Sequence, residues 1–152
     1  MKTNGRGFTL IELIITITII GILAALAVPL TRNTITRERE VALRHDLREI
    51  RTAIDKFKEA SDRGFIQVKL GTEGYPESLD VLVDGVQMAG AVDKKLKFLR
   101  RIPEDPMTKS TDWGLRSYQD DPNSQSWGGQ NVFDVYTKSG GTALDGTKYR
   151  DW

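Results

Sequence analysis

The chain has 152 residues, enough for one small domain beside a membrane segment, and its 22 basic residues nearly balance its 21 acidic ones. This balance supplies no basic field for a nucleic-acid partner. The chain has no cysteine, which excludes a disulfide framework and thiolate chemistry, and its single histidine, His45, argues against zinc-hydrolase and Ser-His-Asp sites. We therefore predict that it is not an enzyme.

The first thirty residues combine a short basic leader with a long apolar run. The leader ends at Gly7, and the stretch from Phe8 to Leu30 is mostly apolar with one carboxylate, Glu12. As a helix this stretch would measure about 34 Å, enough to cross the hydrocarbon core of a bilayer. An ionisable group inside such a span costs a few kcal/mol or more, so Glu12 is a candidate functional residue.

Two ordinary explanations of this N-terminus compete with a more specific one. A plain membrane anchor would place the basic leader in the cytoplasm, although arginines also follow the apolar run closely. A secretory signal would be cleaved at Ala25-Leu26-Ala27, but the run exceeds the usual apolar region of about 7–15 residues. Cleavage there would also discard Glu12 unused.

The segment around the carboxylate reads Gly7-Phe8-Thr9-Leu10-Ile11-Glu12. It resembles the type III signal of type IV pilins and of the pseudopilins of type II secretion systems. The resemblance implies that a prepilin peptidase cuts between Gly7 and Phe8 and methylates the new N-terminus at Phe8. Residues 1–7 would be a leader peptide, and residues 8–30 would be kept as a transmembrane and assembly helix.

Further roles for residues of this helix follow from the resemblance and from physical chemistry. Cleavage frees an amine at Phe8 one helical turn from Glu12, and a buried carboxylate needs a cationic partner. The resemblance implies that Glu12 pairs with the terminal amine of a neighbouring subunit and sets the axial register; its own terminus or a lipid head group is the alternative partner. Pro29 should kink the helix, Gly21 is a second weak point, and in relatives such a stretch can unwind on assembly.

Residues 31–60 contain neither glycine nor proline and predict that the helix continues. One apolar stripe repeats at spacings of three and four, formed by Leu43, Leu47, Ile50, Ile54 and Phe57. Charged residues occupy the other faces, where we expect a solvated surface of weak ion pairs, although some would meet a neighbour in a filament. They include Arg37, Glu38, Arg39, Glu40, Arg44, Arg48, Glu49 and Arg51. For His45, on the same helix, we expect a surface role.

The rest of the chain predicts an α+β domain, with residues 31–152 forming the globular part. Residues 61–75 are expected to form a loop, and Pro76 begins a short helix that Gly85 ends. Three short strands cannot close a core alone, so the apolar helix stripe should supply the missing face. The predicted fold is a long N-terminal helix packed on a small C-terminal antiparallel sheet, pilin-like in design. Its candidate strands are residues 115–119, 132–137 and 148–152, separated by turn signals.

The C-terminal half resembles the major, G-type pseudopilin of type II secretion through Tyr75-Pro76, the Arg101–Pro106 stretch, Asp134-Val135-Tyr136 and the terminal Trp152. The resemblance implies a calcium site in the loop after the Asp-x-Tyr strand. Here residues 137–146 contain one acid, Asp145, whereas calcium takes six or more oxygens. We predict no metal and no cofactor, with calcium as the alternative.

A second group of residues has two open interpretations. They could line a binding groove or a subunit interface, where exposed aromatic residues concentrate. Alternatively, the tryptophans cap the core and the aspartates form turns. The group consists of Trp113, Asp120, Asp121, Trp127 and Gly128-Gly129.

The resemblance implies a structural subunit of a type II secretion pseudopilus or a related type IV pilus-like filament. It would polymerise with itself through residues 8–30 and support protein export. Implied partners are the prepilin peptidase, other pseudopilins, an inner-membrane assembly platform and a separate ATPase. Before assembly the chain would cross the bacterial inner membrane once, with its C-terminal domain in the periplasm. The alternative is a minor or tip pilin that acts as an adhesion module.

Overall fold

The computed structural model describes residues 7–91 and 93–152, without the side chains of residues 26–32. All of the predicted leader except Gly7 therefore lies outside the described residues. The chain divides into two compact units, Met1–Glu38 and Arg39–Trp152, and each is described by itself.

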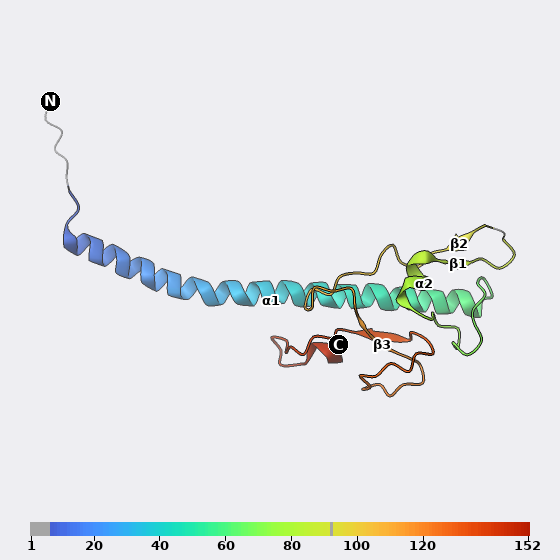
Figure 1. Cartoon of the computed structure of the whole chain (residues 1–152). Coiled ribbons are helices and arrows are strands. Elements are labelled where there is room, and N and C mark those ends of the chain that lie inside the picture. Colours follow the sequence, from blue (N-terminus) through green and yellow to red (C-terminus); the bar gives the residue numbers. More distant parts are fainter. Residues whose placement is uncertain (1–6, 92) are drawn as a thin grey trace, which may run out of the picture. The chain divides into compact units, whose positions relative to one another are not determined.

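A single helix, α1, runs over Leu10–Asp62, as the sequence predicts (Figure 1). Thr9 caps its start, because the Thr9 hydroxyl accepts a hydrogen bond from the Glu12 amide at 3.3 Å. The backbone is helical through both Gly21 and Pro29, but the Pro29 side chain lies outside the described residues. The expected kink or unwinding of this stretch stays a prediction.

Among the residues that the structure describes, no helix holds a stretch long and apolar enough to be classed as a membrane span. The predicted transmembrane segment, residues 8–30, reaches into the stretch whose side chains are not described. That assignment also stays a prediction.

The second unit is built on the apolar stripe of α1. All five predicted stripe residues are buried, with Leu43 and Ile50 fully covered. The stripe packs against side chains from the rest of the unit, among them Leu82, Leu99, Trp113, Val132 and Val135. Spacing at three and four residues therefore identified the core face of the helix correctly.

A short helix and a two-stranded sheet follow the loop after α1. Helix α2 covers Leu79–Asp84, and Gly85 ends it with a positive φ of 81°. Strand β1 (Val86–Gln87) pairs antiparallel with β2 (Lys95–Leu96). The sequence analysis predicted α2 with a start at Pro76, three residues before its observed start at Leu79. It predicted no strand in this region, because two-residue strands leave no periodic pattern.

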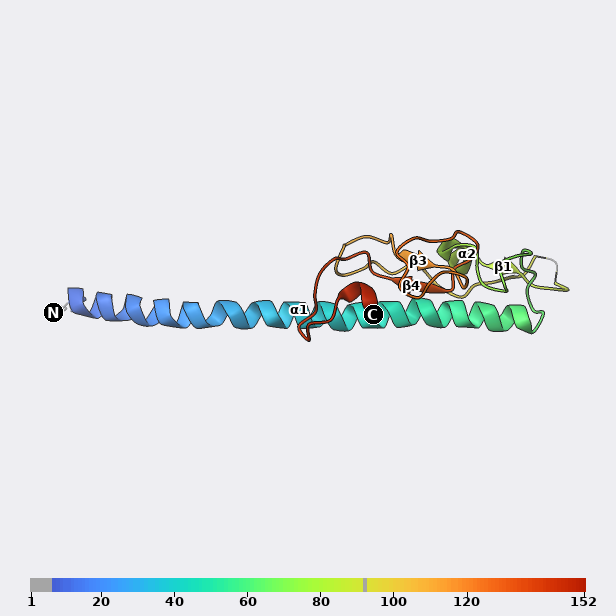
Figure 2. The same ribbon diagram turned by 90° about the horizontal axis from the view of Figure 1, so that it is seen from below.

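The predicted three-stranded sheet is wrong in one strand. Strand β3 (Gly114–Arg116) pairs antiparallel with β4 (Asp134–Tyr136), at two of the predicted positions. The third predicted strand, residues 148–152, contains instead the 3₁₀ turn η1 (Tyr149–Asp151), which lies against α1. Figure 2 shows α2, β1, β3 and β4 on one side of the helix, so the small sheets use α1 as their common support.

Candidate functional site

The predicted processing site lies in non-helical backbone just before α1. Residues 7–9 have no regular secondary structure, and all three are exposed. The Phe8 side chain is 80 % exposed, and a Cβ on Gly7 would meet no atom within 4 Å. The Gly7–Phe8 peptide bond thus lies in exposed, irregular backbone.

Glu12 lies in the first turn of α1, where the helix dipole favours a negative charge. The residue is exposed, and within residues 7–91 and 93–152 its carboxylate has no hydrogen-bond or ion-pair partner. An acceptor with this position can take a cation from outside the subunit.

The helix that follows exposes apolar side chains in all directions. The exposed set from the first unit is Leu10, Ile11, Leu13, Ile14, Ile15, Ile17, Ile19, Ile20, Ile22 and Leu23, each at least half exposed. The hydroxyls of Thr16 and Thr18 donate to carbonyls one turn back, at 2.6 Å to Glu12 and 2.7 Å to Ile14. Because these hydroxyls are satisfied within the helix, they add little polarity to its surface. A helix apolar all round needs lipid or other helices to cover it.

The loop of residues 137–146, where the resemblance implies calcium and we predicted no metal, is organised by its own polar groups. Asp145 accepts hydrogen bonds from the Thr147 amide at 2.9 Å and from the Thr147 hydroxyl at 2.6 Å. These hydrogen bonds, led by that from the Thr147 hydroxyl, lower the pKa of Asp145 below its usual range. The carboxylate therefore serves as the acceptor that closes this turn.

A family model described as "Prokaryotic N-terminal methylation motif" matches residues 2–28. The type IV major fimbrial protein FimA of Dichelobacter nodosus is 47 % identical over 85 residues, covering 51 % of this chain and 53 % of FimA. The type II secretion system core protein G of Pectobacterium carotovorum subsp. carotovorum is 30 % identical over 117 residues, covering 72 % of this chain and 65 % of the relative. The chain is thus pilin-like: it is similar to type IV pilins and to core protein G of type II secretion systems.

A second core protein G, from Pseudomonas aeruginosa, extends the likeness of this pilin-like chain over its whole length. It is 27 % identical over 155 residues, covering 95 % of this chain and 93 % of the relative. The chain spans only about half the length of the FimA protein. No solved structure matches the chain significantly. The fimbrial likeness is thus partial, whereas the likeness to core protein G includes the globular unit.

The pilin-like chain places its second group of predicted residues mainly within its own fold. Trp113 is 3 % exposed and donates a hydrogen bond from its indole to the Pro103 carbonyl at 2.9 Å.

The two aspartates of the group form turns. Asp120 accepts hydrogen bonds from the Ser117 and Gly128 amides at 2.7 and 3.0 Å, which lower the pKa of Asp120. Asp121 closes a turn onto the Asn123 amide at 2.9 Å. The interpretation as core cap and turn residues holds for these three, while Trp127 stays 41 % exposed.

Some charged residues of α1, which the sequence analysis expected to be solvated, contact the rest of the fold instead. The Arg51 guanidinium donates to Asp134 on β4 at 2.7 Å, to the Val135 carbonyl at 3.0 Å and to the Trp152 carbonyl at 2.8 Å. Residues so distant in sequence leave no local pattern, so the analysis had no signal for this contact. Arg51 connects α1 to both β4 and the end of the chain.

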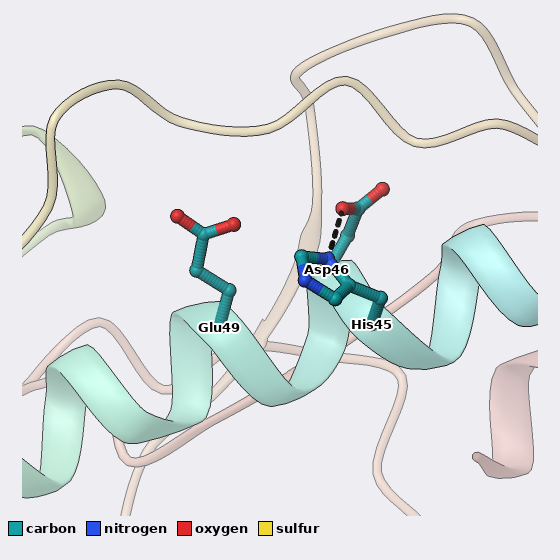
Figure 3. Close-up of side chains that lie close together, drawn as sticks. All are labelled: His45, Asp46 and Glu49. Carbon is teal, nitrogen blue, oxygen red and sulfur yellow. Dashed lines mark hydrogen bonds and ion pairs between the residues drawn. The ribbon is translucent and has the colours of Figure 1, made fainter.

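His45 lies at the surface as predicted, with its side chain 72 % exposed. Its Nδ1 is 3.3 Å from Asp46 Oδ1, and donor atoms of His45, Asp46 and Glu49 lie within 4.8 Å of one another (Figure 3). The three residues lie on one helix, and they are exposed or half-buried. We assign the cluster no ligand.

Proposed function

We propose that this chain is a structural subunit of a type II secretion pseudopilus, equivalent to the subunits named core protein G. The observation that carries the proposal is Glu12 in the first turn of an apolar helix, one turn from the exposed Gly7–Phe8 bond and without an ion-pair partner among the residues that the structure describes. The family match over residues 2–28 and the full-length likeness to a core protein G support it. These relatives carry the names of major or core subunits, which favours a main filament subunit over a minor tip pilin.

The proposed mechanism rests on one ion pair between neighbouring subunits. Cleavage after Gly7 creates an α-ammonium at Phe8, and two opposite charges within lipid or a helix bundle attract strongly. In the proposed filament the Glu12 carboxylate accepts the terminal amine of the next subunit. The exposed apolar side chains of residues 10–23 then cover one another, so assembly buries the surface that lipid covers beforehand.

Location and partners follow from the same proposal. Before assembly the helix of residues 8–30 anchors the subunit in the inner membrane, and the unit Arg39–Trp152 lies in the periplasm. A prepilin peptidase processes the N-terminus, and an assembly platform with its own ATPase drives growth. The subunit itself acts mechanically and carries out no reaction.

Intact-mass measurement of the protein from its native host tests the processing step. The mature chain should lack Met1–Gly7 and carry one added methyl group on Phe8. A mature chain that begins at Val28 would contradict the proposal and support a conventional signal peptide.

The charge of Glu12 is tested by Glu12→Gln, which keeps the shape of the side chain. We expect the variant to insert into the membrane at normal levels but to enter filaments at least ~10-fold less, because the amine loses its ionic partner. Glu38→Gln, another exposed carboxylate of α1, is the matched control and should assemble normally. Normal incorporation of Glu12→Gln beside native subunits would rule out the register role.

A further inference from the structure

Besides the Arg51 contact with the Trp152 carbonyl, two further side chains of α1, one turn apart, attach residues 142–152 to the helix. The first is Glu40, whose Oε1 accepts a hydrogen bond from the Leu144 amide at 2.8 Å and another from the Tyr149 hydroxyl at 3.0 Å. Tyr149 is itself buried, so this contact fixes one side of the C-terminal segment against the core. We call residues 142–152 the C-terminal segment.

The second attachment is Arg44. Its Nη2 lies 3.5 Å from Asp145 Oδ2, and its guanidinium carbon lies 3.8 Å from the ring centre of Trp152. The Trp152 indole donates to the Thr147 hydroxyl at 2.8 Å, and its ring meets Tyr149 edge to face. One guanidinium therefore contacts both the acid and the aromatic ring of the segment.

These contacts leave no place for the cation that the family resemblance implies. Calcium takes six to eight oxygen ligands, several of them carboxylates. Asp145, the single acid of residues 137–146, already accepts two hydrogen bonds from Thr147 and faces Arg44. Two further side-chain carboxylates lie at the segment: Glu40 accepts from an amide and a hydroxyl, and Asp151 lies 3.8 Å from Arg150 Nε. A donor set already engaged by N–H and O–H groups, with a guanidinium beside it, does not fit calcium.

We propose that Glu40 and Arg44 hold the C-terminal segment on α1 in place of a bound calcium ion, so that the segment is ordered without metal. The Arg44 guanidinium supplies the positive charge beside Asp145, and Glu40 supplies the oxygen that receives the segment's amide. Unlike a dissociable ion, both groups belong to the helix. The order of the segment should therefore not depend on the calcium concentration around the protein.

Hydrogen exchange on the full chain in detergent tests this directly. The amide of Leu144, which donates to Glu40, should exchange at the same rate in excess calcium and in excess EGTA. Glu40→Ala and Arg44→Ala should each accelerate exchange of the C-terminal segment at least ~10-fold, equally with and without calcium. Calorimetric titration with calcium chloride should show no binding.

Two controls keep the result interpretable. Arg48→Ala removes an exposed arginine one turn beyond Arg44 that has no hydrogen bond or ion pair with the segment among the described residues, and Glu38→Gln removes an exposed carboxylate near Glu40. Neither should change exchange of the segment. The proposal is overturned if EGTA deprotects Leu144 in the unaltered chain, if calcium binds, or if the Glu40 and Arg44 variants behave like the controls.

Discussion

Single residues explain how small strands stay fixed to a long helix. Asp134 on β4 lies between two arginines, with Arg51 Nε at 2.7 Å and Arg116 Nη1 at 3.2 Å. Its side chain is only 25 % exposed, and that of Arg116 only 14 %. Charged hydrogen bonds in such partly buried places are worth more than exposed surface pairs, because water competes less for them.

The Arg51–Asp134 contact should be measurable as a coupling energy. Arg51→Met and Asp134→Asn should each lower the free energy of unfolding by about 1–3 kcal/mol, since each leaves a partly buried polar partner incompletely paired. The double variant should cost less than the sum of the two single costs, by about 1–2 kcal/mol.

Urea denaturation of the full chain in detergent, followed by tryptophan fluorescence, measures these energies. Arg48→Met is the control for loss of an exposed arginine from α1 and should change stability little. Strictly additive single costs would mean that the contact does not stabilise the domain.

Tyr149 predicts a dependence on alkaline pH. Burial, followed by the hydrogen bond to Glu40 and by the Glu40 charge, raises the pKa of Tyr149 above its usual value of 10.0. A group with a raised pKa in the folded state stabilises the fold below its unfolded pKa and loses that contribution as the pH rises through the folded pKa. The C-terminal segment should therefore loosen only above about pH 10.

Absorbance titration of the tyrosinate band, together with thermal unfolding at each pH, checks this expectation. Tyr149→Phe should remove one late-titrating group from the four tyrosines, and Glu40→Gln should move that group to lower pH. If the late component keeps its size in Tyr149→Phe, the assignment to Tyr149 is wrong.

At the scale of elements, the sequence predicted what depends on long periodic patterns. The stripe from Leu43 to Phe57 repeats over four turns, so both the existence of α1 and its buried face could be deduced. Gly85 marked the end of α2, because the backbone freedom of a glycine is a local property.

The short strands and their contacts with α1 depend on tertiary packing, which local sequence patterns do not encode. Val135 and Tyr136 on β4 and Thr137 just after it are all buried, so the side chains here do not alternate between buried and exposed. Gly114 shows why: a Cβ there would lie 2.3 Å from the Tyr136 ring, which packs across the strand pair. Similarly, residues 148–152 look like a strand, but the contacts of Tyr149 with Glu40 and Trp152 turn them into η1.

The candidate site divides in the same way. Gly7, Phe8 and Glu12 were identified from a short contiguous motif, because all three lie within a few residues of the start of one helix. Glu40 and Arg44 were counted among solvated charges, since their partners lie about a hundred residues away in sequence. Functions that depend on contiguous residues can be deduced from the sequence alone, whereas contacts between distant segments can be identified only from the three-dimensional structure.

At the scale of the whole molecule, the two units carry different tasks. Among the residues whose side chains are described, every member of the buried core lies between Leu43 and Tyr149, within the unit Arg39–Trp152. The exposed apolar residues of the first unit contribute nothing to that core. A subunit of this kind can keep one folded domain while its N-terminal helix moves from lipid to a helix bundle.

A chain of residues 34–152 should therefore fold without the apolar helix start. We expect it to be monomeric without detergent, because the exposed apolar stretch of residues 10–23 is removed. Its free energy of unfolding should agree with that of residues 8–152 in detergent within about 1 kcal/mol, since no core residue is lost. Near-UV circular dichroism and urea denaturation compare the two chains, and sedimentation gives the association state.

A chain of residues 48–152, which lacks Leu43, Leu47, Glu40 and Arg44, is the matched control and should lose cooperative unfolding. If residues 34–152 instead showed no near-UV signal, the globular unit would need the N-terminal helix for its own stability, and assembly could not be a transfer of that helix alone.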